Sequence, residues 1–102
     1  MRTIYFIIWE FRVQKSSEKE FERVYGPDGD WAGFFSSGEG YLGTVLFSNV
    51  AEPGVYLTID KWTSKEAYDR FRTVRRSEYE ELDRKCETLT ASEKMLGSFA
   101  QQ

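Results

Sequence analysis

Four residues near the middle of the chain combine polar and aromatic side chains at a spacing of two: Tyr56, Thr58, Asp60 and Trp62. In a β-strand, residues two apart point to the same side of the sheet. If the Trp62 indole faces packed helices, Thr58 and Asp60 face them too, where a purely structural core would favour Val or Leu. Burial would raise the pKa of the Asp60 carboxyl, so this group could accept a proton from a weak acid such as a phenol.

A simpler interpretation of Asp60 stays open. The carboxylate could lie at the rim of the sheet and pair with Arg70 or another arginine, because structural ion pairs perturb carboxylates as often as functional sites do. The sequence thus predicts either a proton acceptor in a cavity or one half of an ion pair.

The composition excludes several classes of function. A chain of 102 residues is expected to form one domain over residues 1–102, and its net charge of −3 argues against nucleic acid, which binds basic surfaces. Anionic membranes are disfavoured for the same reason, and no apolar run approaches the ~20 residues of a membrane helix. The single cysteine, Cys86, cannot form an intrachain disulfide, so we expect a cytoplasmic protein.

The sequence contains no histidine. Histidine is the commonest general base and metal ligand, and it is the usual group that activates a cysteine nucleophile. The acidic residues are scattered over predicted helix surfaces rather than clustered. We therefore predict neither a metal site nor a bound cofactor.

The hydrophobic pattern predicts strands over residues 3–13, 41–47, 55–62 and about 88–99, a helix from residue 17, a short helix after residue 30 and a long helix from residue 63. Capping boxes at Ser17 and Thr63, and Asp30 as a cap, predict where these helices begin. The long helix has a 3.6-residue apolar stripe that includes Val74, and its other side, with Arg72, is interpreted as a solvated face.

This order of elements predicts a ferredoxin-like α+β fold, in which both helices cover one face of an antiparallel sheet. The predicted strands are apolar on the opposite face as well. A second copy of the chain is the natural cover for such a face, so we expect a homodimer that forms through the open sheet face.

Four different short motifs follow one another along the chain. They are Phe11-Arg12-Val13, Gly40-Tyr41-Leu42-Gly43, Trp62-Thr63-Ser64-Lys65-Glu66-Ala67-Tyr68 and Leu96-Gly97-Ser98-Phe99. In their order and spacing they resemble the antibiotic biosynthesis monooxygenase-like (ABM) family of the dimeric α/β-barrel superfamily. The resemblance implies two sheets packed face to face in a dimer, with a small-molecule pocket between sheet and helices in each subunit. Some members oxidise aromatic polyketides with molecular oxygen and no cofactor, others degrade haem, and others bind or rearrange small metabolites.

The resemblance also implies a position for Trp62, because the matching tryptophan of the oxidising members lies in the pocket. Many relatives carry a histidine where this chain has Phe71. Without a histidine the axial ligand of haem is missing, so haem degradation is not expected.

The candidate catalytic residues are Asp60, as the base, and Trp62, as a wall that orients the substrate. The candidate substrate-binding residues are Trp9, Trp31, Tyr56, Thr58, Tyr68 and Phe71, although filling the core is the favoured interpretation of Trp9 and Trp31. Two functions follow. The first is a cofactor-free monooxygenase acting on a small aromatic or polyketide-like metabolite, and the alternative is a non-catalytic dimeric binding or accessory protein. An open cavity would favour the first.

Overall fold

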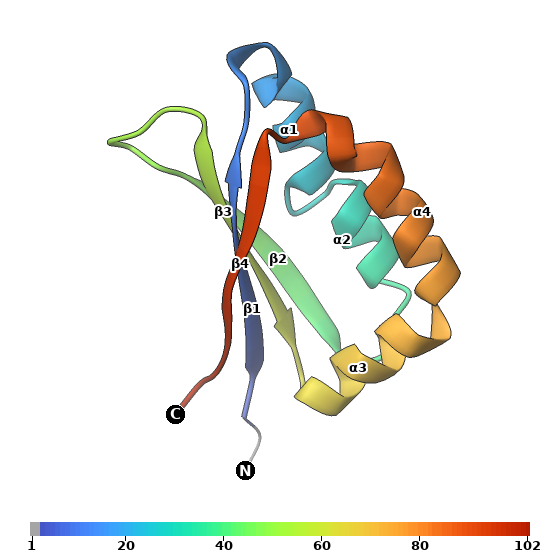
Figure 1. The fold of residues 1–102 in the computed structure, drawn as a ribbon. Coiled ribbons are helices and arrows are strands. Elements are labelled where there is room, and N and C mark those ends of the chain that lie inside the picture. The colour runs from blue at the N-terminus through green and yellow to red at the C-terminus, as the bar shows by residue number, and fades with distance from the viewer. Residues whose placement is uncertain (1–2) are drawn as a thin grey trace.

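Four antiparallel strands form one sheet in the order β2-β3-β1-β4 (Figure 1). The strands are β1 (Tyr5–Arg12), β2 (Tyr41–Ser48), β3 (Val55–Trp62) and β4 (Ser92–Ala100). The structure is a computed structural model and describes residues 3–102. The strand order and the antiparallel pairing confirm the predicted ferredoxin-like α+β fold.

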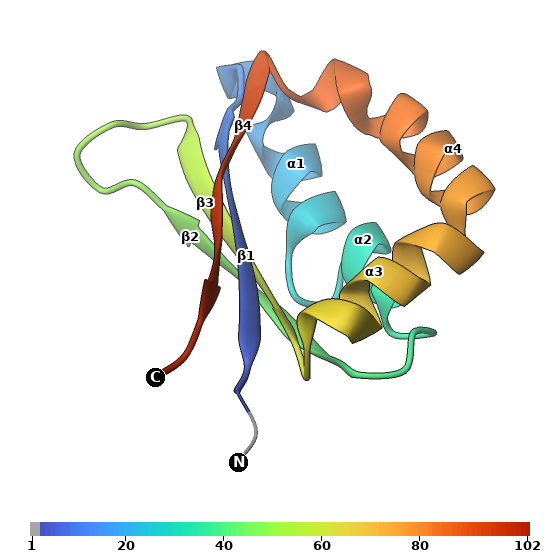
Figure 2. The same ribbon diagram turned by 60° about the horizontal axis from the view of Figure 1, so that its bottom comes forward.

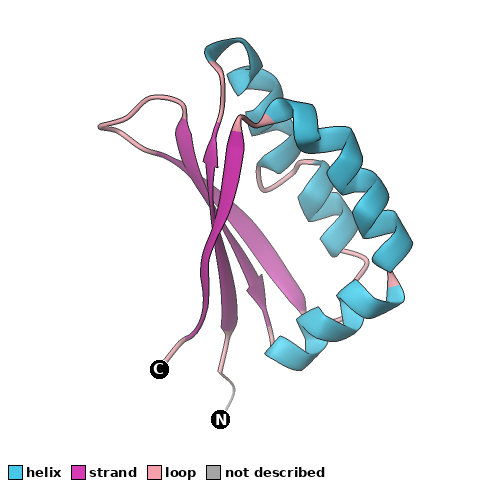
Figure 3. Ribbon diagram, viewed as in Figure 1, coloured by secondary structure: helices cyan, strands magenta, loops and turns pink. Residues whose placement is uncertain are grey.

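The helices all lie on one face of this sheet, as the two layers in Figure 3 show. They are α1 (Glu18–Tyr25), α2 (Asp30–Phe35), α3 (Lys65–Val74) and α4 (Arg76–Cys86), with short 3-10 turns at Lys15–Ser17 and Glu87–Leu89. A core of mainly aromatic side chains fills the space between the two layers. None of the helices in residues 3–102 has the length and apolar character needed to cross a membrane.

The alternation of β3 places its residues as predicted. Tyr56, Thr58, Asp60 and Trp62 are all buried beneath the helices, whereas the residues between them are less buried and face away. Because β3 is a central strand with neighbours on both sides, its register is firmly held. The polar pair Thr58 and Asp60 therefore belongs to the interior and not to the rim of the sheet.

The capping predictions are wrong in detail. Ser64 is the N-cap of α3, and its hydroxyl accepts a hydrogen bond from the Ala67 amide at 3.1 Å. The backbone of Thr63 still belongs to the sheet and not to the helix, because its amide donates to the carbonyl of Gly40, just before β2, at 2.7 Å. Ser17 occupies the N-cap position of α1 as predicted, but its side chain makes no capping hydrogen bond. Gly29, rather than Asp30, occupies the N-cap position of α2.

The predicted long helix is two helices that meet at Arg75, whose φ of −108° and ψ of 30° interrupt the helical backbone. Figure 2 shows α3 and α4 meeting at an angle. Phe71 is buried, whereas Val74, predicted on the same stripe, is the last residue of α3 before the break and is 72% exposed. Neither Pro nor Gly marks this position, so the 3.6-residue period gave no sign of the break.

The face of the sheet that carries no helix is apolar along its middle. Phe47 and Phe99 lie on this face, and both are 51% exposed. Phe47 is the cross-strand partner of Leu57, and Phe99 is the partner of Phe6. Ile8 in β1 and Ile59 in β3 are cross-strand partners in the two central strands, between β2 with Phe47 and β4 with Phe99. We call these six residues the open face.

Candidate active site

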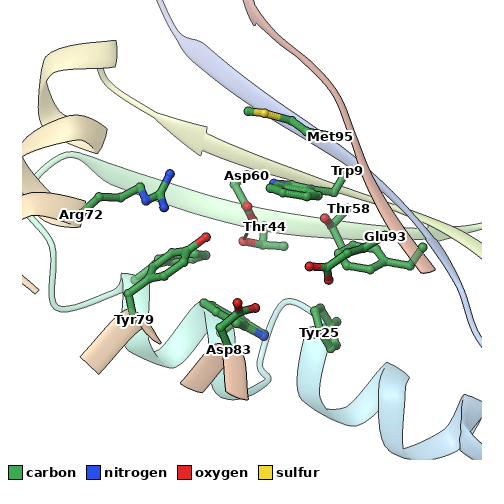
Figure 4. Close-up of a pocket in the computed structure, with 13 residues that line it drawn as sticks. Trp9, Tyr25, Thr44, Thr58, Asp60, Arg72, Tyr79, Asp83, Glu93 and Met95 are labelled. Atoms are coloured by element: carbon green, nitrogen blue, oxygen red, sulfur yellow. Dashed lines mark hydrogen bonds between the residues drawn. The ribbon is translucent and has the colours of Figure 1, made fainter. Parts of the chain in front are cut away.

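A cavity of about 290 Å³ lies between the sheet and the helices (Figure 4). Its walls are largely aromatic, with Trp9 on β1, Trp31 and Phe35 on α2, and Tyr79 on α4. Thr44, Thr58 and Asp60 line it from the sheet, and Arg72 lines it from α3. A flat aromatic molecule suits such a space, because the rings offer stacking area and the few polar groups can fix its orientation.

Asp60 ends a chain of side-chain hydrogen bonds that runs along the sheet. Thr44 Oγ1 donates to Asp60 Oδ1 at 2.7 Å, and Thr44 and Asp60 are direct cross-strand partners in β2 and β3. The Tyr41 hydroxyl lies 2.6 Å from Thr44 Oγ1. Because the Thr44 hydroxyl has one hydrogen and gives it to Asp60, Tyr41 must donate in this second bond. The chain therefore orients one carboxylate oxygen and leaves the other without a side-chain hydrogen bond in residues 3–102.

Asp60 is only 8% exposed. Burial raises its pKa from 3.8 to about 6, and the hydrogen bond from Thr44 opposes the rise. The carboxyl takes part in no ion pair recorded for residues 3–102, so the predicted pairing with Arg70 or another arginine is not formed. Asp60 is thus a carboxyl group able to gain or lose a proton near neutral pH inside an aromatic cavity.

The mouth of the cavity carries two further carboxylates, Asp83 from α4 and Glu93 from β4. Both residues are exposed. Although Glu93 is exposed, partial desolvation of its carboxyl raises its pKa, and the neighbouring Asp83 raises it further. The two groups therefore share a negative patch at this end of the cavity.

Trp62 is completely buried and does not line the cavity. Its indole packs against the rings of Tyr41, Tyr68 and Phe71, with centroids 5.3 to 5.6 Å away, and against Phe35 at 5.9 Å. Phe35 is the ring that reaches the cavity, so Trp62 forms a second layer behind it. No hydrogen-bond partner for Trp62 Nε1 occurs in the described part of the chain.

The predicted site residues divide into two groups. Trp9, Trp31, Thr58 and Asp60 line the cavity together, while Tyr56, Trp62, Tyr68 and Phe71 lie outside its lining. Tyr56 donates to Glu22 at 2.6 Å near α1, and Tyr68 accepts from Arg72 at 3.4 Å. Phe71 packs within the ring cluster around Trp62.

The sequence interpretation missed Thr44, Arg72, Tyr79, Asp83 and Glu93. A signal existed for the helical residues, since Arg72 follows Tyr68 by four residues and Asp83 follows Tyr79 by four, which is the spacing of one helix face. Thr44 and Glu93 had no local signal, because their place beside the cavity depends on strand pairing.

Comparisons with known proteins agree with this architecture. The model of the family described as "Antibiotic biosynthesis monooxygenase" matches residues 4–75. Among curated protein sequences, none matches the chain significantly.

Solved structures share the fold at low sequence identity. A mutant of SnoaB, a cofactor-independent oxygenase from Streptomyces nogalater, superposes with a TM-score of 0.79 at 20% identity over 97% of this chain and 93% of that one. A candidate antibiotic biosynthesis monooxygenase from Bordetella bronchiseptica gives 0.71 at 18% identity over 98% and 96%. A third, from Nitrosomonas europaea, gives 0.72 at 8% identity over 99% and 92%.

The sheet, the helices on one of its faces and the cavity between the two layers define a small α+β protein of ferredoxin-like architecture with an internal ligand-sized site. Within that class, the chain belongs to the antibiotic biosynthesis monooxygenase family, whose model covers more than half of its length.

Proposed function

We propose that the protein is a cofactor-independent monooxygenase that acts on a small aromatic or polyketide-like metabolite bound in the cavity. The observation that carries this proposal is the position of Asp60, a buried carboxyl with a pKa of about 6 in an aromatic cavity. A general base works best when its pKa lies near the operating pH. The likeness to the cofactor-independent oxygenase SnoaB supports the same conclusion.

The reaction needs only a base and molecular oxygen. Asp60 takes a proton from an acidic C–H or O–H group of an electron-rich phenol or enol, and the resulting carbanion gives an electron to O2. The two radicals combine into a peroxide, which regains the proton from Asp60. When the oxidised carbon began as CH2, loss of water leaves a carbonyl, so that one oxygen atom enters the product and the other leaves as water.

Each side chain has a separate role in this proposal. Asp60 moves the proton, and Thr44 and Tyr41 orient its carboxylate. Trp9, Trp31 and Thr58 bind the substrate in the cavity. The second-layer residues Trp62, Tyr68 and Phe71 support Phe35, and Tyr56 fixes α1 through Glu22.

We also propose that two copies of the chain associate through the open face. That face leaves two phenylalanines half exposed over the middle of a sheet, and a matching face of a second copy would remove them from water. This arrangement leaves the cavity, on the other side of each sheet, free to take its ligand.

Oxygen consumption with a panel of electron-rich phenols and enolisable polycyclic ketones tests the function. We expect wild-type protein to turn over at least one of them and Asp60→Asn to lose 100-fold or more, on the order of the contribution of a general base. Asp28→Asn, an equivalent change at an exposed position, should keep wild-type activity. Tight binding of a panel member without oxygen consumption would instead support a non-catalytic binding protein.

A further inference from the structure

Arg72 is the one cation among the residues that line the cavity. Its guanidinium carbon lies 4.5 Å from the centre of the Tyr79 ring, and Nη1 donates to the Tyr68 hydroxyl at the long distance of 3.4 Å. A guanidinium has five N–H donors, so most of those of Arg72 remain available.

Several other cations on the same two helices pair with acids, although Arg70 and Arg84 have no ion pair recorded for residues 3–102. Lys65 pairs with Asp69, and Arg76 pairs with Glu80 at 3.2 Å, each four residues along the helix. Arg72 takes part in no ion pair recorded for residues 3–102, and its side chain instead lies along Tyr79, which lines the cavity, and Tyr68, which lies outside its lining. Stacking on an aromatic ring holds a guanidinium in place while leaving its edge free for an anion.

No ion pair recorded for residues 3–102 joins Arg72 to the carboxylates that line the cavity. Asp60 comes from the sheet and contacts Thr44, with no recorded bond to Arg72. Figure 4 shows Arg72 extending from its helix toward the strands, well separated from Glu93 at the opposite end of the view. A ligand lying across the aromatic middle would therefore meet a cation at one end and carboxylates at the other.

We propose that Arg72 binds an oxyanion of the ligand, and that the ligand is an aromatic molecule with a phenolic or enolic oxygen that is bound as its anion. This inference rests on the proposed function, because it takes the cavity as the substrate site and gives that site its anion-binding residue. The proton leaves the ligand O–H for Asp60, the oxygen keeps the electron pair, and the N–H groups of Arg72 donate to it.

The need for such a residue follows from acidity. A phenol such as the tyrosine side chain has a pKa near 10, so proton transfer to a carboxylate with a pKa of about 6 is unfavourable by about 10⁴-fold. A cation within hydrogen-bonding distance lowers the pKa of an acid by about 1 to 3 units, which recovers tenfold to a thousandfold of that ratio. No other lining side chain carries a positive charge.

The experiment compares two probes of similar size that differ in charge: 4-nitrophenolate, at a mildly alkaline pH where it is ionised, and 4-nitroanisole, its neutral methyl ether. Affinities are measured by calorimetry for wild type, Arg72→Gln, Arg72→Lys and Arg76→Gln. Arg76 is the matched control, because it lies near Arg72 with its side chain 81% exposed but does not line the cavity.

We expect Arg72→Gln to lose about tenfold or more in affinity for 4-nitrophenolate and less than about threefold for 4-nitroanisole. Arg72→Lys should keep part of the preference for the anion, and Arg76→Gln should change neither affinity. Equal losses for both probes would mean that Arg72 only shapes the cavity, and an unchanged affinity for the anion would mean that it does not bind it. Either result overturns the proposal, as does wild-type protein that fails to bind 4-nitrophenolate.

The same measurement in the Asp60→Asn background separates this inference from the proposed function. The other titratable lining groups are Tyr25, Tyr79, Asp83 and Glu93, and they are the same in both backgrounds. We expect the dependence on Arg72 to persist without the Asp60 carboxylate, and its disappearance would count against Arg72 as the anion-binding group. A protein that binds the anion through Arg72 but never consumes oxygen would refute the oxygenation while leaving this inference intact.

Discussion

Thr44 on β2 and Asp60 on β3 face each other as direct cross-strand partners, joined by a hydrogen bond of 2.7 Å from Thr44 Oγ1 to Asp60 Oδ1. Both side chains are buried, and both line the cavity. A strand pair therefore holds the one buried carboxylate of the cavity in a fixed direction.

Replacing Asp60 with Asn should change how stability depends on pH. The folded protein holds the Asp60 proton with a pKa of about 6, against 3.8 for the ordinary group, so the folded state binds this proton more tightly. Its contribution to stability is complete below about pH 4 and is lost as the pH rises through about 6. Relative to Asp60→Asn, the wild-type free energy of unfolding should fall by up to about 3 kcal/mol over this range. Urea unfolding at a series of pH values measures the difference, and parallel curves would refute it.

Replacing Thr44 with Val should raise the pKa of Asp60 further, because the hydrogen bond from Thr44 is what opposes the effect of burial. The change also leaves the Tyr41 hydroxyl without its acceptor. We expect a loss of about 1 to 3 kcal/mol in stability at neutral pH. Carboxyl-carbon NMR titration reports the pKa, and Thr44→Ser, which keeps the hydroxyl, is the control. A Val variant with the wild-type pKa would contradict the assignment.

Replacing Trp62 with Phe should destabilise the protein through lost packing alone. The indole is fully buried, and its Nε1 has no partner in residues 3–102, so the change removes no hydrogen bond. Contacts with Phe35 and the rings around it are lost, and we expect a cost of about 1 to 3 kcal/mol. Thermal unfolding measures this cost.

Activity in the Trp62→Phe variant tests whether this residue acts indirectly. As a second-layer residue, Trp62 should alter KM by shifting Phe35 and leave the pH dependence of kcat, which reports Asp60, in place. A shifted pH profile would show that Trp62 touches the reacting groups.

Replacing Phe99 with Glu should disrupt association through the open face. Phe99 lies opposite Phe6 on this face and is 51% exposed. A charge there would be buried at an apolar contact between two copies, which is strongly unfavourable. Sedimentation at micromolar concentration should show wild-type dimers and a mostly monomeric variant. The control is Val50→Glu, because Val50 is 98% exposed in the loop between β2 and β3, and this variant should remain dimeric. Wild-type protein that sediments as a monomer would refute the proposed dimer.

Local periodicity was enough to predict much of this protein. The two-residue period of β3 assigned Thr58, Asp60 and Trp62 to the interior face, because alternation depends only on strand geometry. The order of strands and helices predicted the ferredoxin-like sheet, since few topologies accommodate that order. The start of α3 was predicted to within two residues, although the capping side chain proved to be Ser64.

The composition of the cavity depended on contacts between distant parts of the chain. Thr44 meets Asp60 only because β2 pairs with β3 in one register, and a shift of one residue would turn its hydroxyl to the open face. The break at Arg75 sets the angle at which α4 brings Tyr79 beneath Arg72, and no residue type in the sequence marks it. Trp62 points inward as the strand pattern requires, yet Phe35 packs between it and the cavity. Strand alternation thus determined which side chains are interior, whereas strand register and helix packing decided which of them line the cavity.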